Sequence, residues 1–261
     1  MSLMHYPSAP FVRLLQFSSI AGLVVIPVLA LAVQEPPQPN DPGLRDRDVN
    51  ASVPNISGMW QVRGYNRYIK PEDGSLPPWL PWNQQAFEER AAAEAAGTPL
   101  YDPTAACFPS GIPRIIAAPY PVEIVQTPDQ VVFLYETQHL FRVVHLGKQH
   151  PAVIEPSSMG HAVGHWEGDT LVVDSTGFVD TTQIDEQGSK HSAQMRVIER
   201  IRKLDNGSLE VEFTIDDPVW TKPWSAEVRW AKTEGPLFEY ACHEGNYGMI
   251  NILNGARVQE K

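Results

Sequence analysis

Polar and apolar residues alternate along much of the second half of the chain. Between residues 208 and 216, Leu209, Val211, Phe213 and Ile215 form one apolar set, with polar side chains between them. Successive side chains of a strand point to opposite faces, so this pattern predicts a strand with one face in a core. Similar segments flank three turn sequences, which predicts three hairpins. The paired segments are 161–166 with 170–175, 195–203 with 208–216, and 226–232 with 237–243.

One helix is expected between Gln84 and Ala96. Asn83 is a suitable N-cap, and Gly97 ends the helix. The chain contains 24 prolines, which disfavour long helices and favour strands joined by rigid loops. Serial hairpins with one short helix and proline-rich loops predict a mainly β fold. The specific expectation is a single antiparallel up-and-down barrel that occupies residues 55–261.

The N-terminal segment has the features of an export signal. Residues 14–33 carry no charge, Arg13 precedes them, and Ala30-Leu31-Ala32 offers a cleavage site. We expect a signal peptide at 1–33, a disordered linker at 34–54, and a periplasmic or secreted protein. The alternative is that the apolar run stays in place as a membrane anchor, in which case the protein is attached to a membrane.

Charge argues against one class of partner, and the cysteine content predicts a cross-link. The chain has 20 Lys and Arg against 31 Asp and Glu, a net charge of −11 that argues against nucleic-acid binding. Its two cysteines, Cys107 and Cys242, are expected to form a disulfide in an oxidising compartment. The alternative is a pair of buried free thiols.

Two sequence resemblances support a barrel in an exported protein. Gly58-Met59-Trp60 resembles the Gly-x-Trp opening of lipocalins, in which the Trp plugs one end of an up-and-down barrel. Most of 55–246 is similar to a large family of secreted bacterial proteins of mostly hypothetical function. That similarity rests on the segments 164–174, 191–192, 197–200, 217–218, 222–224 and 239–246. It implies compartment and a barrel-like fold, and it adds little about chemistry.

Some polar residues are in register with apolar faces and are therefore expected inside the barrel. Glu199 alternates in phase with Met195, Val197 and Ile201. A buried carboxylate of this kind is either a functional group or one half of an ion pair with a nearby arginine such as Arg200 or Arg202.

The last predicted strand shows the same anomaly. There, Tyr240 and Glu244 share a face with Phe238 and Cys242, so a phenol and a second carboxylate are expected in the lumen. The alternative is a tyrosine hydroxyl that caps a polar network at the end of the barrel.

The segment 130–146 admits two registers. As one continuous strand, it places Tyr135, His139 and Phe141 in the lumen, and His139 becomes a candidate general acid or base. A bulge or turn at 136–138 shifts the register and brings Arg142 inward instead.

Histidines raise the question of a metal site. His161 and His165 are four residues apart, but glycines at 160, 164 and 168 argue against a helix. In a strand the two would lie about 13 Å apart, too far to chelate one ion. We therefore predict no metal site and assign Trp166, beside His165, to the rim of the barrel.

The sequence lacks a nucleophile elbow, a phosphate-binding glycine loop and a dinucleotide fingerprint. The favoured function is an exported, cofactor-independent enzyme of the lyase or isomerase class that acts on a small hydrophobic or aromatic compound, with a lyase or decarboxylase of an aromatic carboxylate or ether as the specific version. The alternative is a non-catalytic binding protein for such a compound. Expected catalytic residues are His139, Glu199 and Tyr240, and expected substrate-binding residues are Tyr135, Phe141, Arg142, Trp166 and Glu244.

Overall fold

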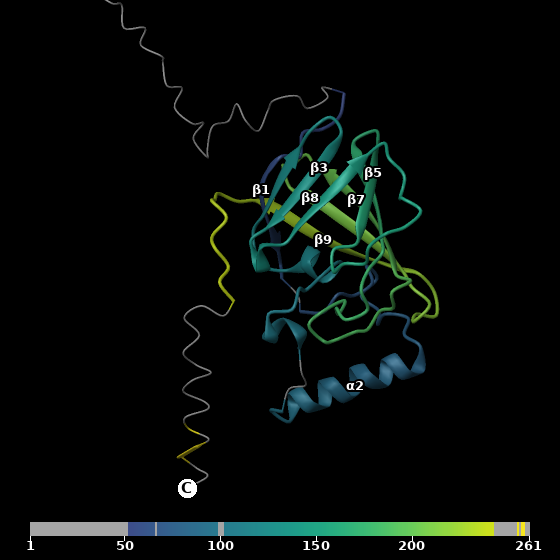
Figure 1. Cartoon of the computed structure of the whole chain (residues 1–261), viewed down its shortest axis with the longest axis vertical. Helices are drawn as coiled ribbons and strands as arrows, with labels where there is room; N and C mark the ends of the chain where they lie inside the picture. Colours follow the sequence, from purple (N-terminus) through teal and green to yellow (C-terminus); the bar gives the residue numbers. More distant parts are fainter. Residues whose placement is uncertain (1–51, 66, 99–101, 243–254, 256, 259–261) are drawn as a thin grey trace, which may run out of the picture. The chain divides into compact units, whose positions relative to one another are not determined.

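The computed structural model describes residues 52–65, 67–98, 102–242, 255, 257 and 258. Nine strands in this part of the chain form a closed barrel, with each strand beside the next and β9 hydrogen-bonded to β1 (Figure 1). The strands are β1 (Gly58–Arg63), β2 (Val122–Gln126), β3 (Gln130–Tyr135), β4 (Phe141–Leu146), β5 (His161–Glu167), β6 (Thr170–Thr176), β7 (Arg196–Lys203), β8 (Leu209–Asp216) and β9 (Trp224–Lys232). The predicted mainly β, lipocalin-like barrel is confirmed. The predicted signal peptide and most of the predicted linker lie outside the described residues.

One pair of neighbouring strands departs from the up-and-down order. β4 and β5 run parallel, with Val144 opposite Ala162, whereas the other neighbouring pairs are antiparallel. Parallel neighbours need a connection that returns to the starting end of the first strand. The segment 147–160 makes this connection, and Gly177 leaves room for the side chain of Ile154 against the barrel.

Two of the three predicted hairpins are confirmed, and the third is wrong. β5 and β6 join at Gly168, and β7 and β8 join through a turn that contains Gly207; both glycines have positive φ. The strand expected after β9 is absent, since the described residues 237–242 form no strand. β9 already pairs with β8 on one side and β1 on the other, so no free edge remains beside it.

The helix α2 (Pro81–Ala95) begins earlier than expected. Pro81 occupies its first turn, where the missing N–H costs nothing, and Leu80 is the N-cap residue. Asn83 is therefore not the cap, and it lies buried within the helix, where its side chain exchanges 3.4 Å hydrogen bonds with the backbone of Lys190. Short 3-10 turns η1 (Pro103–Ala106), η2 (Arg114–Ala117) and η3 (Thr137–His139) lie in the loops. No helix among the described residues is long and apolar enough to cross a bilayer.

Alternating side chains fill the barrel as the strand patterns predict. Leu209, Val211, Phe213 and Ile215 of β8 are all fully buried. Trp60 of β1 is also fully buried, and its indole N–H donates a 2.9 Å hydrogen bond to the carbonyl of Ile56. The barrel interior is therefore a packed core, and accessible polar groups must be sought at its ends and outer face.

Candidate functional site

Glu199 lies inside the barrel, as its register predicts. Its carboxylate accepts hydrogen bonds from both terminal nitrogens of Arg142, and the side chains of the two residues are 0% and 1% exposed. Burial acts to lower the pKa of Arg142, but the negative charge of Glu199 outweighs this effect and the net pKa is raised. The guanidinium therefore keeps its charge. The arginine expected as an ion-pair partner was Arg200 or Arg202, and the structure places Arg142 there instead.

The inward position of Arg142 results from the turn η3. Gln138 and His139 both have left-handed backbone angles, which interrupt the strand between β3 and β4 and shift the register. Arg142 therefore points inward, whereas Phe141 is 63% exposed and His139 is also exposed. The predicted placement of His139 and Phe141 in the lumen is wrong, and the alternative register is the observed one.

Apolar groups seal the interior ion pair from solvent. The guanidinium carbon of Arg142 lies 4.7 Å from the ring centroid of Phe133, a cation–π contact. Tyr135 is buried beside the pair, and burial raises the pKa of its hydroxyl to about 12. Because Tyr135 and Glu199 are buried in this core, neither side chain is placed where a ligand from solvent could reach it.

The remaining predicted site residues have different locations. Tyr240 does not lie on a strand, and it lines a cleft at the end of the barrel. Trp166 is half-buried on β5. Glu244 lies outside the described residues. The predicted convergence of His139, Glu199 and Tyr240 in one lumen is therefore wrong.

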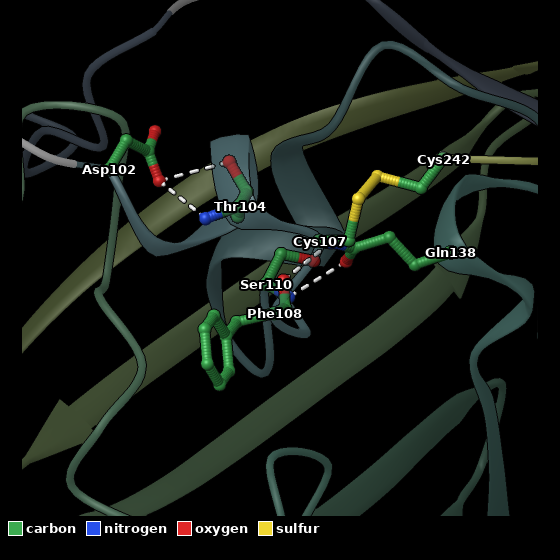
Figure 2. The surroundings of a disulfide bond; sticks show 7 residues. All are labelled: Asp102, Thr104, Cys107, Phe108, Ser110, Gln138 and Cys242. Atoms are coloured by element: carbon green, nitrogen blue, oxygen red, sulfur yellow. Dashed lines mark hydrogen bonds between the residues drawn. A yellow bond between two sulfur atoms is a disulfide. The ribbon is translucent and has the colours of Figure 1, made fainter. Parts of the chain in front are cut away.

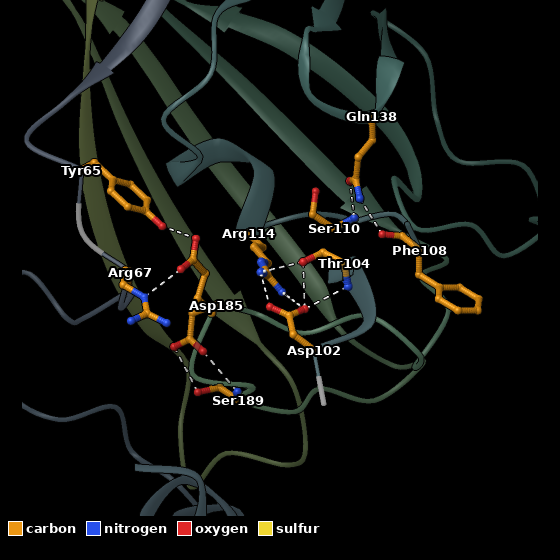
Figure 3. A network of polar contacts seen from close by, with 11 residues as sticks. Tyr65, Arg67, Asp102, Thr104, Phe108, Ser110, Arg114, Gln138, Asp185 and Ser189 are labelled. Carbon is orange, nitrogen blue, oxygen red and sulfur yellow. Dashed lines mark hydrogen bonds and ion pairs between the residues drawn. The ribbon is translucent and has the colours of Figure 1, made fainter. Parts of the chain in front are cut away.

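The cleft beside Tyr240 is a candidate site because charged, aromatic and buried titratable residues line it together. It has a volume of about 130 Å³, and the segments after β1, around η1 to η3 and after β6 all contribute to it (Figure 3). Its lining residues are Tyr65, Arg67, Ile69, Thr104, Ser110, Arg114, Ala117, Ala118, Pro119, Tyr120, Thr137, Gln138, Asp185, Glu186 and Tyr240.

Asp185 is the buried carboxyl group of this cleft. The residue is only 4% exposed, and Ser189 donates hydrogen bonds to its two oxygens from the backbone at 3.2 Å and from the hydroxyl at 3.1 Å (Figure 3). Burial raises the pKa of Asp185 above its ordinary value, and the bonds from Ser189 and the charge of Arg114 offset only part of that rise. A carboxyl group with a raised pKa exchanges protons closer to neutral pH.

Glu186 holds two neighbouring lining residues in place. Its carboxylate accepts a hydrogen bond from the hydroxyl of Tyr65 and a 2.9 Å bond from Nε of Arg67. Arg67 also donates a 2.6 Å bond to Glu94 of α2, which links the cleft to the helix. Burial and the negative charge of Glu186 raise the pKa of Tyr65, so its hydroxyl stays protonated.

Arg114 supplies a second positive charge and is fixed by Asp102. The two terminal nitrogens of Arg114 donate bonds of 3.0 and 2.8 Å to the two oxygens of Asp102 (Figure 3). Burial acts to raise the pKa of Asp102, but the hydrogen bonds from Arg114 and Thr104 lower it below its ordinary value. Asp102 is therefore ionised and holds the guanidinium rigidly, which suits a group that orients a ligand.

The segment 237–242 contributes Tyr240 to the lining of the cleft and is attached to the rest of the protein at three points. We call it the C-terminal strap. Cys242 forms the predicted disulfide with Cys107, with the two Cα atoms 6.0 Å apart (Figure 2). The backbone N–H of Phe238 donates a 2.9 Å bond to Glu136, and that of Tyr240 donates a 2.6 Å bond to Nε2 of His139. His139 thus contacts the strap from outside the barrel.

Asp185, Glu186, Arg67 and Arg114 were missed at the sequence level because they lie outside the strands, in loops and at the start of the short 3-10 turn η2. Strand alternation identifies inward polar residues only where a strand exists. The sequence Asp185-Glu-Gln-Gly-Ser189 does carry a turn signal, an aspartate followed by Gly188 and a serine. That signal indicates a turn without indicating that the aspartate is buried.

The histidines are dispersed into different environments. His165 is exposed on β5, and His191 is buried in the loop before β7, where its Nε2 lies 2.7 Å from the hydroxyl of Thr182. His145, His150 and His161 meet on the outer face of the barrel. Within the described residues, no group of three or more His, Cys, Asp or Glu side chains is arranged to hold a metal ion.

Comparison with known proteins adds no assignment: no protein-family model matches the sequence, and no curated protein matches it. The candidate site therefore rests on its own geometry.

Proposed function

We propose that the protein is an exported acid–base enzyme that acts, without an organic cofactor, on a small aromatic compound bound in the cleft. The observation that carries this proposal is Asp185, a buried carboxyl group with a raised pKa in the wall of a cleft that also contains two arginines. Titratable groups displaced by burial in a cleft are enriched at active sites. Asp185 takes the role that the sequence patterns suggested for His139 and Glu199.

The size and lining of the cleft favour a compound with one aromatic ring. Its volume is about 130 Å³, and an engineered protein cavity of about 150 Å³ is known to accept benzene. Tyr65, Tyr120 and Tyr240 offer aromatic surface, and the last two rings meet edge to face with centroids 6.1 Å apart. Aromatic partners prefer this geometry, and a ligand ring can extend it.

The two arginines of the cleft favour a substrate with an anionic or developing anionic group. Arg114 is held by Asp102 and Arg67 by Glu186, so both guanidinium groups are oriented before a ligand arrives. Preoriented charges that face developing negative charge are the largest single contribution to many enzymatic rate enhancements. A carboxylate, a phenolate or an enolate on the substrate fits this arrangement.

The chemistry that these groups support is an elimination of the lyase type. Asp185 in its ionised form removes a proton from the substrate, and the electron pair of the broken bond forms a double bond as the leaving group departs. Tyr240 gives its hydroxyl proton to the leaving group, and exchange with solvent moves the proton from Asp185 back to Tyr240. An isomerase uses the same pair of groups, with the proton returned to another atom of the substrate.

Export is part of the same proposal. The disulfide between Cys107 and Cys242 is of the kind that forms in oxidising compartments. The uncharged segment 14–33 supports a signal peptide, and we expect the mature protein to begin near Val33 and to be periplasmic or secreted. Recovery of the full-length chain in membranes alone would support a retained anchor instead.

The deciding experiment combines a ligand screen with one matched pair of variants. The purified protein is incubated with single-ring aromatic carboxylates, phenols and ethers, binding is followed by thermal shift, and turnover is followed by mass spectrometry. For a compound that turns over, Asp185→Asn should lower kcat by about 100-fold or more. Asp205→Asn, in the exposed turn between β7 and β8, serves as the control and should retain full activity.

Two results would contradict the proposal. Turnover that is unchanged in Asp185→Asn removes Asp185 from the chemistry. A compound that binds tightly in the cleft and is never converted favours a non-catalytic binding protein.

A further inference from the structure

Three histidines meet on the outer face of the barrel, and none of them lines the cleft. His145 lies on β4, His150 follows β4 in the 147–160 connection, and His161 begins β5. The rings of His145 and His161 stack with centroids 5.4 Å apart. The rings of His150 and His161 meet edge to face at 5.0 Å, and their Nδ1 atoms are 2.9 Å apart.

The separation of the two Nδ1 atoms limits what can lie between them to a proton or a metal ion. Two imidazole nitrogens approach this closely either because one proton lies between them or because both bind one metal ion. Metal–imidazole bonds are about 2.0 Å long, so two ligands at 90° are separated by about 2.8 Å and two at the tetrahedral angle by about 3.3 Å. The observed 2.9 Å is close to the right-angle value. Right-angled nitrogen ligands are typical of tetragonal Cu²⁺, and tetrahedral ones are typical of Zn²⁺.

We propose that His150 and His161 form a chelating site for Cu²⁺ through their Nδ1 atoms. Among the described residues no third His, Cys, Asp or Glu is arranged as a ligand, so solvent takes the remaining positions. Cu²⁺ is also the divalent ion of its row that nitrogen sites bind most tightly. The proposal is independent of the function assigned to the cleft.

Asp174 supports His150 from behind. Its Oδ2 lies 3.7 Å from Nε2 of His150, and this nitrogen is buried and has no hydrogen-bond partner among the described residues. A carboxylate near the second nitrogen favours a proton there and leaves Nδ1 free to bind a metal, and such carboxylates are common behind histidine ligands. Arg196 donates bonds of 2.9 and 2.7 Å to Asp174 and fixes its orientation.

Titration with Cu²⁺ alone tests the site. The protein is purified without a histidine tag, and isothermal calorimetry should show that it binds one equivalent of Cu²⁺. His150→Gln and His161→Gln should each weaken Cu²⁺ binding by more than about 10-fold. Loss of the carboxylate in Asp174→Asn should weaken it by about 10- to 100-fold. The matched control is His165→Gln, an exposed histidine of the same strand, which should leave binding unchanged. Zn²⁺ should bind more weakly than Cu²⁺.

Spectroscopy of the unaltered protein covers the case in which a variant fails to fold. Electron paramagnetic resonance should show a tetragonal Cu²⁺ centre with two imidazole nitrogens, and Cu²⁺ should broaden amide signals around residues 145, 150 and 161. If broadening is confined to other parts of the chain, or if folded His150→Gln and His161→Gln bind Cu²⁺ as tightly as the control, the two histidines share only a proton and the proposal is wrong.

Discussion

The barrel interior and the cleft at its end both place arginine beside carboxylate, and they differ in access to solvent. Arg142 and Glu199 are sealed in the core, whereas Arg67 and Glu186 of the cleft have side chains that are 48% and 31% exposed. A sealed pair can specify how the strands are registered, but it cannot exchange contacts with a substrate. The cleft pair can do so because one side of it faces solvent.

The comparison also changes how an inward-pointing carboxylate should be interpreted. Two charges taken out of water carry a large desolvation cost, which their mutual attraction offsets only when the geometry is good. Glu199 has this good geometry, because it accepts a bidentate pair of hydrogen bonds from Arg142. Asp185 has no arginine bonded to it among the contacts described, and its raised pKa reflects that incomplete compensation.

The largest expected loss of stability follows from removing one charge of the interior pair, Arg142 and Glu199. Glu199→Gln leaves the charge of Arg142 buried without a counter-charge, and breaking a buried pair in this way costs about 3–5 kcal/mol. We expect urea unfolding to show a loss of that size. The double variant Arg142→Met with Glu199→Leu removes both charges and should recover most of it. A Glu199→Gln protein within about 1 kcal/mol of the unaltered one would show that the interior is hydrated.

The disulfide is expected to have the next largest effect, and it acts on the cleft. It joins residues 135 positions apart, and loss of such a disulfide typically costs about 2–5 kcal/mol. Cys107→Ser with Cys242→Ser should lower the free energy of unfolding by that amount and weaken ligand binding, because Tyr240 is held at the cleft by the C-terminal strap. The unaltered protein in reductant is the matched control and should behave identically. Equal urea midpoints for oxidised and reduced protein would contradict this.

These two regions also differ in how well the sequence predicts them. The barrel class, two hairpins and the burial of Glu199 follow from alternation, because a strand fixes which side chains share a face. The position of Arg142 depends on a turn at 137–139 in which Gln138 and His139 are left-handed without being glycine. Neither residue type signals that conformation reliably, so the sequence left two registers open.

The cleft was hardly predictable, and the reason is its construction from loops. Arg67, Arg114 and Asp185 come from three segments outside the strands that are far apart in sequence, and no periodic pattern links them. The cysteine pair was the exception, because two cysteines in a chain expected to be exported have only each other as partners. That pair ties the loop around Cys107 to residue 242, and it did not reveal the cleft beside Tyr240.

The pH dependence of stability should show a moderate effect that comes from Asp185 in the cleft. The pKa of Asp185 is raised by burial, so its contribution to stability is complete below about pH 4 and is lost as pH rises through the folded-state pKa. Asp185→Asn removes this dependence. Between pH 4 and neutral pH, the unaltered protein should therefore lose stability relative to the variant, by about 1.4 kcal/mol for each unit by which burial raises the pKa. Urea unfolding at several pH values measures the difference, and a difference that does not change with pH would contradict the prediction.

The smallest expected effect comes from a second arginine–carboxylate pair that two hydrogen bonds join, here through Nε and one terminal nitrogen of the arginine. Arg196 also donates two hydrogen bonds to one carboxylate, that of Asp174, but its side chain is 56% exposed on the outer face of the barrel. Water already solvates these charges in the absence of the contact, so the pair should contribute less than about 1 kcal/mol. Arg196→Met should lower the free energy of unfolding by that amount or less, and the loss should shrink in 1 M NaCl because salt screens exposed charges. The loss caused by Glu199→Gln should persist in the same salt, since ions do not enter the core. If both losses respond equally to salt, burial does not distinguish the two pairs, and the contrast between a sealed interior and an accessible surface fails.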